Sequence, residues 1–269
     1  MHILFTKANW ERSELSVADF VRLCAENGYD GTEIYLPARP EGTAEIRELH
    51  EAAGLKIVSH IATEGATPAE HLRSLEERYR RAAELHPLFI NSHTGKDHFS
   101  FAASLQIFEA GEKLVAEHGI PLLHETHRGR ALFSAPAALH FLREVPSLRL
   151  TADFSHWVCV HESDLKDQPE ALDAAMQAAG HIHARVGFDE GPQISDPRNP
   201  AHAAWLERFT SWWKHILDLR RAEGREWFTI TPEFGPEPYM PLAGASTNPV
   251  GDAWEYNSWM HRHLRETLI

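Results

Sequence analysis

The chain has 269 residues, of which 43% are hydrophobic and 24% are charged, a composition typical of a globular enzyme with a full hydrophobic core. The formal net charge of −13 argues against a nucleic-acid partner, because phosphate binding requires clustered Lys and Arg. No run approaches the roughly 18 to 20 consecutive apolar residues of a membrane helix, and the N-terminus lacks the pattern of a secretory signal, so we expect a cytoplasmic protein with no membrane partner.

The first half of the chain alternates short apolar runs with helical patterns. Strands are predicted at 3–5, 29–36, 55–61 and 88–93, where apolar runs end at polar or turn residues. Helices are predicted from Ser16 to Gly28, from about Thr43 to Gly54, from Thr67 to about His86, and over 99–118. Capping boxes mark the starts at Ser16 and Thr67. A turn rich in Pro and Gly separates the second strand from its helix.

The second half repeats the alternation. Strands are predicted at 120–125, 148–153, 181–185 and 227–231, and helices at 135–143, 170–178, 205–223 and 253–267. Trp205, Trp212 and Trp213 have helical spacing, which more often indicates packing than a cofactor site. Trp212 and Trp213 point in different directions, so one of them could face a partner subunit in a homodimer. The long loop at 236–252 could cover the barrel or support that dimer.

Eight strands, each followed by a helix and without a break in composition, predict an α/β fold with one domain over residues 1–269. Eight is the number that closes a (β/α)8 TIM barrel, in which a parallel eight-stranded barrel is surrounded by outer helices. A doubly wound open sheet is the alternative. No Gly-x-Gly-x-x-Gly follows the first strand, so we expect no nucleotide cofactor.

Several predicted strands end in side chains that can bind a metal. In the run from His124 to His127, period-two geometry sends Glu125 and His127 to one face of the strand and His124 to the other. Asp153 and Glu233 end the sixth and eighth predicted strands in the same way. The carboxyl ends of all strands of a barrel meet at one end, so we expect these side chains to be neighbours there.

Together with a histidine of the seventh strand, the three carboxylates make a mostly oxygen ligand set. Such a set suits Mn²⁺, Mg²⁺ or Co²⁺ better than a structural zinc. The chain has 19 histidines and two cysteines, so imidazole ligands are plentiful and a thiolate cluster is not expected. We expect one divalent metal, with Mn²⁺ first and Mg²⁺, Co²⁺ or Zn²⁺ as alternatives. The opposing interpretation, four separately solvated loop residues, requires four coincidences.

On these residues the chain resembles the sugar phosphate isomerase and epimerase superfamily with the xylose isomerase-like TIM barrel, over nearly its whole length. Members carry a Glu at strand five, an Asp and a His three residues later at strand six, a His at strand seven and a Glu at strand eight. The resemblance implies four metal ligands: Glu125, Asp153, His183 and Glu233. It also implies that His156 and Arg185 contact the substrate. His181 shares a strand face with His183, which is preferred for its later position and for the resemblance.

The resemblance further implies the isomerisation or epimerisation of a small carbohydrate or its derivative. Loss of a proton next to the carbonyl gives an enediolate, which a metal stabilises as a Lewis acid. Glu125 and Glu233 are the implied catalytic pair, one removing the proton and the other returning it. Return to the same carbon is epimerisation and return to its neighbour is isomerisation. The sequence does not decide between them.

Other residues near these strand ends keep several roles open. Ketose 3-epimerases of the tagatose type carry a second Glu six residues after the strand-five ligand, where this chain has Ala131, so that substrate is not assigned. Arg128 and Arg130 could bind an anionic group of the substrate through forked hydrogen bonds, or be surface residues. His60 and His93 end the third and fourth strands, and could contact substrate, hold a second metal with Glu125, or be structural.

Two alternative functions follow. A nuclease that resembles the endonuclease IV type recruits histidines from strands three and four, as His60 and His93 would allow. It also needs an Asp-x-His after strand seven, and the stretch 185–192 has none. The second alternative is a barrel that binds a sugar or metabolite without turnover, in which two facing glutamates such as Glu125 and Glu233 would be hard to explain.

Overall fold

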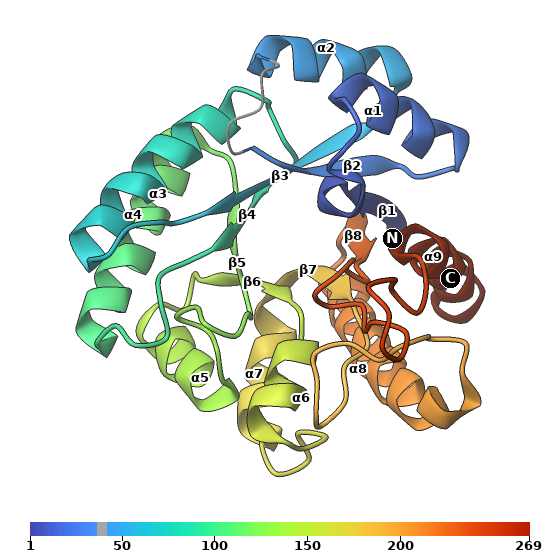
Figure 1. The fold of residues 1–269 in the computed structure, drawn as a ribbon. Coiled ribbons are helices and arrows are strands. Elements are labelled where there is room, and N and C mark those ends of the chain that lie inside the picture. The colour runs from blue at the N-terminus through green and yellow to red at the C-terminus, as the bar shows by residue number, and fades with distance from the viewer. Residues whose placement is uncertain (37–41) are drawn as a thin grey trace.

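The computed structural model describes residues 1–36 and 42–269. Eight parallel strands, β1 to β8, pair in sequence order and close into a barrel, and helices surround it (Figure 1). The predicted (β/α)8 TIM barrel with outer helices is therefore confirmed. The turn rich in Pro and Gly that was expected after the second strand falls mainly on 37–41, outside the described residues.

All eight predicted strands are present. They are β1 (His2–Ala8), β2 (Gly31–Tyr35), β3 (Lys56–Ala62), β4 (Ile90–His93), β5 (Leu122–Glu125), β6 (Arg149–Ala152), β7 (Ala179–Ala184) and β8 (Trp227–Pro232). The first strand is longer than predicted. Its pairing with β8 starts at His2, and its pairing with β2 continues to Ala8, because ladder hydrogen bonds do not require an apolar side chain at every position.

The helices follow the strands as expected, with one addition. They are α1 (Val17–Glu26), α2 (Thr43–Ala53), α3 (Pro68–Ala83), α4 (Phe101–His118), α5 (Ala135–Glu144), α6 (Ser155–His161), α7 (Pro169–Ala178), α8 (Ala203–Ala222) and α9 (Ala253–Leu268). Ser16 caps α1, and Thr67 with Glu70 forms a reciprocal capping box on α3. The short helix α6 was not predicted, because seven residues are too few to show a helical period.

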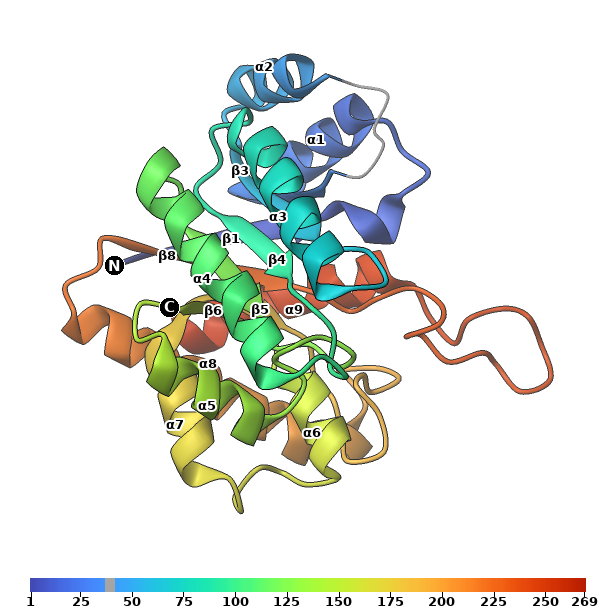
Figure 2. The same cartoon turned by 90° about the vertical axis from the view of Figure 1, so that its left-hand side faces the viewer.

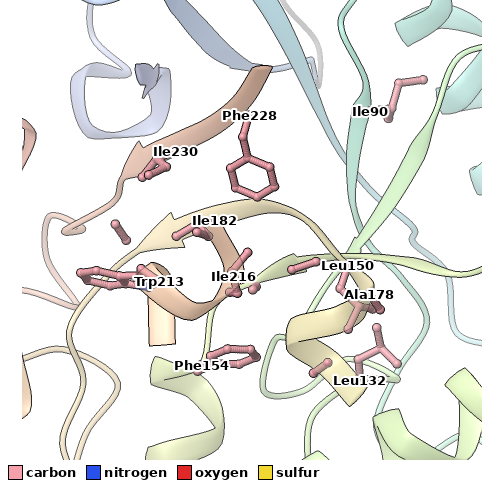
Figure 3. Packing of buried hydrophobic residues seen from close by; sticks show 14 of the residues in the cluster. Ile90, Leu132, Leu150, Phe154, Ala178, Ile182, Trp213, Ile216, Phe228 and Ile230 are labelled. Carbon is pink, nitrogen blue, oxygen red and sulfur yellow. The ribbon is translucent and has the colours of Figure 1, made fainter. Parts of the chain in front are cut away.

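The apolar side chains form two cores. The main core lies between the barrel and its helices, where Ile182 of β7 and Ile216 of α8 are close together (Figure 3). Val58, Phe89 and Leu123 form a separate buried cluster. These three lie two or four residues before site residues on β3, β4 and β5, so they share the inward face of their strands. The small cluster therefore fills the N-terminal part of the barrel interior.

The tryptophans of α8 belong to the main core. Trp212 is 6% exposed and Trp213 is 1% exposed within the single chain. Trp212 packs edge-on against Phe154, with ring centroids 5.9 Å apart. The expectation that one of them faces a partner subunit is therefore wrong, because the chain itself covers both rings. A homodimer stays a prediction that these residues do not support.

The two ends of the barrel differ. The long loop after β8 projects from the end where the strands finish, while the N-terminus and the turn before β8 lie at the opposite end (Figure 2). Metal ligands were expected at the first of these ends. Among the helices within 1–36 and 42–269, none is both long and apolar enough to cross a membrane.

Candidate functional site

The structure brings four predicted metal ligands together at the C-terminal end of the barrel. Glu125 ends β5, Asp153 directly follows β6, His183 lies near the end of β7, and Glu233 directly follows β8. Each offers one ligand atom, and all four atoms lie within 4.8 Å of one another. All four residues are buried. Parallel strand topology thus places residues that are far apart in sequence in one cluster.

The two ring nitrogens of His183 have different surroundings. Nδ1 lies 2.8 Å from Glu233 Oε2 and 3.3 Å from Glu125 Oε2, yet it makes no hydrogen bond with any described residue. Nε2 lies 2.9 Å from Oε2 of Glu33. Imidazole nitrogen and carboxylate oxygens are common ligands of one divalent cation. A shared cation would explain why this nitrogen lies so close to two carboxylates without a hydrogen bond to either. The donors therefore fit a divalent metal.

Glu33 of β2 was not selected from the sequence. Its carboxylate accepts hydrogen bonds from Asn91 Nδ2 and Thr231 Oγ1, each at 3.0 Å, in addition to that from His183. Burial alone would raise the pKa of Glu33, but His183 and His181 hold it well below its usual range. A buried carboxylate on the far nitrogen of a ligating histidine fixes its tautomer and orientation. The sequence signal that could have revealed Glu33 is a charged residue inside a predicted strand, here the strand observed at Gly31–Tyr35, because a carboxylate there needs partners to be buried.

Asn91 of β4 joins Glu33 to the ligand cluster. Its Nδ2 also donates to Glu125 Oε2 at 2.9 Å, and His93 Nε2 lies 3.0 Å from the same oxygen. Burial opposes ionisation of Glu125, but His93 and His183 hold its pKa well below the usual range. The carboxylate is therefore ionised at neutral pH.

Arg185 was expected to bind substrate oxygens. In the structure its Nε donates to Asp153 Oδ2 at 3.1 Å and its Nη2 donates to Glu233 Oε2 at 2.7 Å. Nη1 is buried without a hydrogen-bond partner among the described residues. Burial raises the pKa of Asp153 to about 6, although Arg185 opposes this change. Arg185 thus holds two of the expected ligands and keeps one nitrogen for a further oxygen.

His156 lies behind the cluster. It belongs to α6, is fully buried, and has its Nε2 3.6 Å from Asp153 Oδ2. Its ring centroid is 3.9 Å from that of His127. Burial, followed by the neighbouring His127, holds the pKa of His156 well below its usual range. The cavity of about 200 Å³ beside the cluster is not lined by His156, so its expected contact with substrate stays a prediction.

A cavity of about 200 Å³ adjoins the ligand cluster. Its lining residues are Trp10, Tyr35, His60, His93, Glu125, His127, Arg185, Glu233 and Tyr239. His60 and His93 therefore reach the cavity, and with Glu125 they also form a second group of potential ligands. Burial, aided by His93, lowers the pKa of His60 to about 4, so the His60 imidazole is neutral at physiological pH.

Two aromatic side chains that were not selected from the sequence, Trp10 and Tyr239, line this cavity. Tyr239 lies on the loop after β8, with Arg185 over its ring at 4.4 Å, and it packs edge-on against Trp10 at 5.7 Å. The first part of the loop thus covers the site, while 241–250 is largely exposed.

The guanidinium of Arg128 also lies over the Tyr239 ring, 5.0 Å from its centroid, outside the cavity lining. Arg130 donates to the carbonyl of Thr63.

Comparison with known proteins agrees with this architecture. Residues 21–231 match the model of a family described as xylose isomerase-like TIM barrel. A xylose isomerase domain containing protein from Salmonella typhimurium LT2 superimposes with a TM-score of 0.66 at 18% identity, covering 98% of this chain and 97% of that one.

Two further structures represent different activities. A sugar phosphate isomerase/epimerase from Parabacteroides distasonis has a TM-score of 0.62 at 14% identity and covers 98% of this chain and 93% of that one. Endonuclease IV from Thermus thermophilus has a TM-score of 0.60 at 16% identity and covers 98% of each. At these identities the likeness shows the fold alone. No curated protein matches the sequence.

Proposed function

The chain belongs to the xylose isomerase-like TIM barrel family, and we propose that it is a divalent-metal-dependent isomerase or epimerase of a sugar or sugar derivative. The observation that carries the proposal is the buried meeting of three carboxylates and one imidazole beside a small cavity. A cytoplasmic location and the absence of nucleic-acid and membrane partners stay predictions.

Glu125, Asp153, His183 and Glu233 would hold one divalent cation. The oxygen-rich donor set favours Mn²⁺, with Mg²⁺, Co²⁺ and Zn²⁺ as alternatives. When bound, the cation supplies Lewis-acid stabilisation of the negative charge that develops on substrate oxygens. The buried hydrogen bond from His183 Nε2 to Glu33 would keep Nδ1 free and aimed at the cation.

Replacement of Glu33 tests this supporting role. We expect Glu33→Gln to weaken metal binding by about 10- to 100-fold, although all four expected ligands remain. This is the effect typical of removing a residue that hydrogen-bonds to a metal ligand. Titration calorimetry with Mn²⁺ measures the change, and thermal unfolding checks that the barrel stays folded. Glu76→Gln, on the solvent-facing side of α3, is the control. Unchanged affinity in Glu33→Gln would mean that Glu33 is only a packing residue.

Glu125 and Glu233 would move the proton. Both line the cavity, and they come from different strands, so a substrate carbon between them could lose a proton on one side and regain it on the other. Burial opposes their ionisation, but neighbouring histidines, and Arg185 in the case of Glu233, lower both pKa values. Asn91 donates to Oε2 of Glu125, and Arg185 donates to Oε2 of Glu233, which leaves Oε1 of each carboxylate available for the proton.

The cavity suits a small carbohydrate. Trp10 and Tyr239 present aromatic surface for the C–H face of a sugar, and His60 and His93 present ring nitrogens for its hydroxyl groups. Arg185 Nη1, which has no partner among the described residues, is a further donor for a substrate oxygen. This combination of aromatic walls with a few convergent polar groups is typical of small-molecule sites.

Isotope exchange tests the reaction class. Incubation with Mn²⁺ and a panel of ketoses, aldoses and their acid or phosphate derivatives in D₂O should place deuterium on a carbon next to the carbonyl for at least one member, because proton return draws on solvent. NMR and mass spectrometry detect the label. A broad panel without exchange, from protein that holds its metal, would favour a barrel that binds its ligand without turnover.

One observation favours a second candidate, a metal-dependent hydrolase that resembles endonuclease IV. His60, His93 and Glu125 offer ligand atoms within 4.8 Å of one another, and could hold a second metal with Glu125 as the bridge. The stretch 185–192 lacks the Asp-x-His of such nucleases, and the net charge of −13 opposes binding to a phosphate backbone. The isomerase or epimerase is therefore preferred.

A further inference from the structure

A second cavity lies at the opposite end of the barrel from the candidate metal site. Its volume is about 400 Å³, within the range of small-molecule pockets. It is lined by residues at the starts of strands, among them Arg149, the first residue of β6, and Trp227, the first residue of β8. The turn that leads into β8 lies at this end, away from the loop that covers the metal site (Figure 2).

Apolar side chains line this cavity. Phe89 and Leu123, members of the small interior cluster, line it, and Leu88 extends the same surface. Trp227 also lines it, and its side chain is 40% exposed, unlike the large aromatic residues of the core. A half-exposed tryptophan beside a concave apolar surface provides area that a bound organic molecule would remove from water.

Three arginines also line the cavity. Arg149 reaches it from β6, Arg220 from the end of α8, and Arg225 from the turn before β8. Arg220 is 4% exposed and uses Nη1 and Nη2 on backbone carbonyls, while its buried Nε has no hydrogen-bond partner within the described part of the chain. Burial lowers the pKa of Arg220, and the charges of Arg225 and Arg149 lower it further against the opposing effect of Glu223.

The local charges do not balance. Glu223 lies 2.8 Å from Arg220 and 3.7 Å from Arg225, and Glu226 lines the cavity, so two carboxylates accompany three guanidinium groups. Arg149 donates Nη1 to the carbonyls of Pro146 and Leu148 and makes no ion pair within the described part of the chain. This excess of positive charge is unusual on a chain with a net charge of −13. An anion in the cavity would relieve the repulsion and could accept forked hydrogen bonds from arginine.

We propose that this cavity is a second ligand site, which binds a small amphipathic carboxylate. The carboxylate group contacts Arg149 and Arg225, and the apolar body of the ligand packs against Leu123 and Trp227. Arg220, whose Nη1 and Nη2 are held by backbone carbonyls, contributes its positive charge from below the surface. A bare inorganic anion would leave the apolar surface exposed to water, and a neutral apolar molecule would leave the arginines uncompensated. The site is independent of the metal-dependent function proposed above.

Fluorine NMR of protein labelled with 5-fluorotryptophan tests the proposal, because one tryptophan reports on each cavity. Trp227 lines the second cavity and Trp10 lines the cavity beside the metal site. Trp227→Phe and Trp10→Phe assign the two resonances. We expect 3-phenylpropionate to shift the Trp227 resonance in a saturable way without shifting that of Trp10. The neutral 3-phenyl-1-propanol should bind at least about tenfold more weakly, and inorganic phosphate should leave the resonance unchanged.

Arginine variants complete the test. Arg225→Gln and Arg149→Gln should each weaken binding of 3-phenylpropionate by about tenfold, the loss of one charge-assisted hydrogen bond. Arg80→Gln is the matched control, because the two arginines have similar surroundings. Arg80 is 55% exposed and 3.6 Å from Glu76, and Arg225 is 59% exposed and 3.7 Å from Glu223. Any of four results would overturn the proposal. They are a shift of the Trp10 resonance alone, equal affinity for the alcohol and the carboxylate, unchanged affinity in both arginine variants, and the lack of saturable binding.

Discussion

Asp153→Asn should leave the purified protein without stoichiometric metal, whereas the unmodified chain should hold about one divalent ion. Asp153 Oδ1 accepts from the backbone N–H of Ser155, and Oδ2 accepts from Arg185 Nε. An asparagine has only one accepting oxygen and would turn a donating amide toward one of these donors. The substitution therefore removes a negative ligand and also disturbs Arg185, which holds Glu233.

The expected loss of metal affinity exceeds the roughly 10- to 100-fold typical of replacing a residue that only hydrogen-bonds to a metal ligand. Elemental analysis after dialysis measures it, and Glu233→Gln should behave in the same way because Glu233 Oε2 lies 2.8 Å from His183 Nδ1. Asp173→Asn, at an exposed position on α7, controls for the chemical change. If Asp153→Asn and Glu233→Gln both retained full metal content, the four-residue site would not be the metal site.

Turnover should fall by ~10²-fold or more in Glu125→Gln and in Glu233→Gln when each is assayed with metal in excess, while substrate still binds. Glutamine keeps the shape of the side chain and a carbonyl oxygen that can act as a ligand, but it cannot accept the proton of a carbon acid. The excess of metal separates this effect from metal loss. Steady-state kinetics and equilibrium binding with the substrate found by isotope exchange measure the two quantities.

His60→Ala and His93→Ala provide the comparison for these two variants. Both histidines line the cavity, so their loss should mainly weaken substrate binding if they contact the sugar. Metal content is measured alongside. Should either histidine variant lose a metal ion while the glutamine variants keep near-normal rates, the two-metal hydrolase would replace the isomerase or epimerase as the better explanation.

The barrel and the residues that meet at its C-terminal end could be predicted from the sequence alone. Apolar runs alternating with helical patterns favour a closed barrel when eight strands are available, since every strand of a parallel sheet must bury both faces. Strand periodicity separates Glu125 from His124, and the topology brings Glu125 to Asp153, Glu233 and the seventh strand. These inferences succeed because they rest on local chain geometry that is repeated in every β-α unit. The choice of His183 over His181 on that strand rested on its later position and on the family resemblance.

The partner that each side chain meets could not be predicted in this way. Glu33 is 150 positions from His183, and periodicity assigns a residue to a face without revealing what lies opposite. Arg185 emerges from β7 where a substrate contact was expected, but Asp153 and Glu233 are within hydrogen-bond reach and retain it. Trp212, considered for a subunit contact, is covered by its own chain. Hydrogen bonds and burial depend on distances of a few ångströms between segments remote in sequence, and those distances exist only once the barrel has closed.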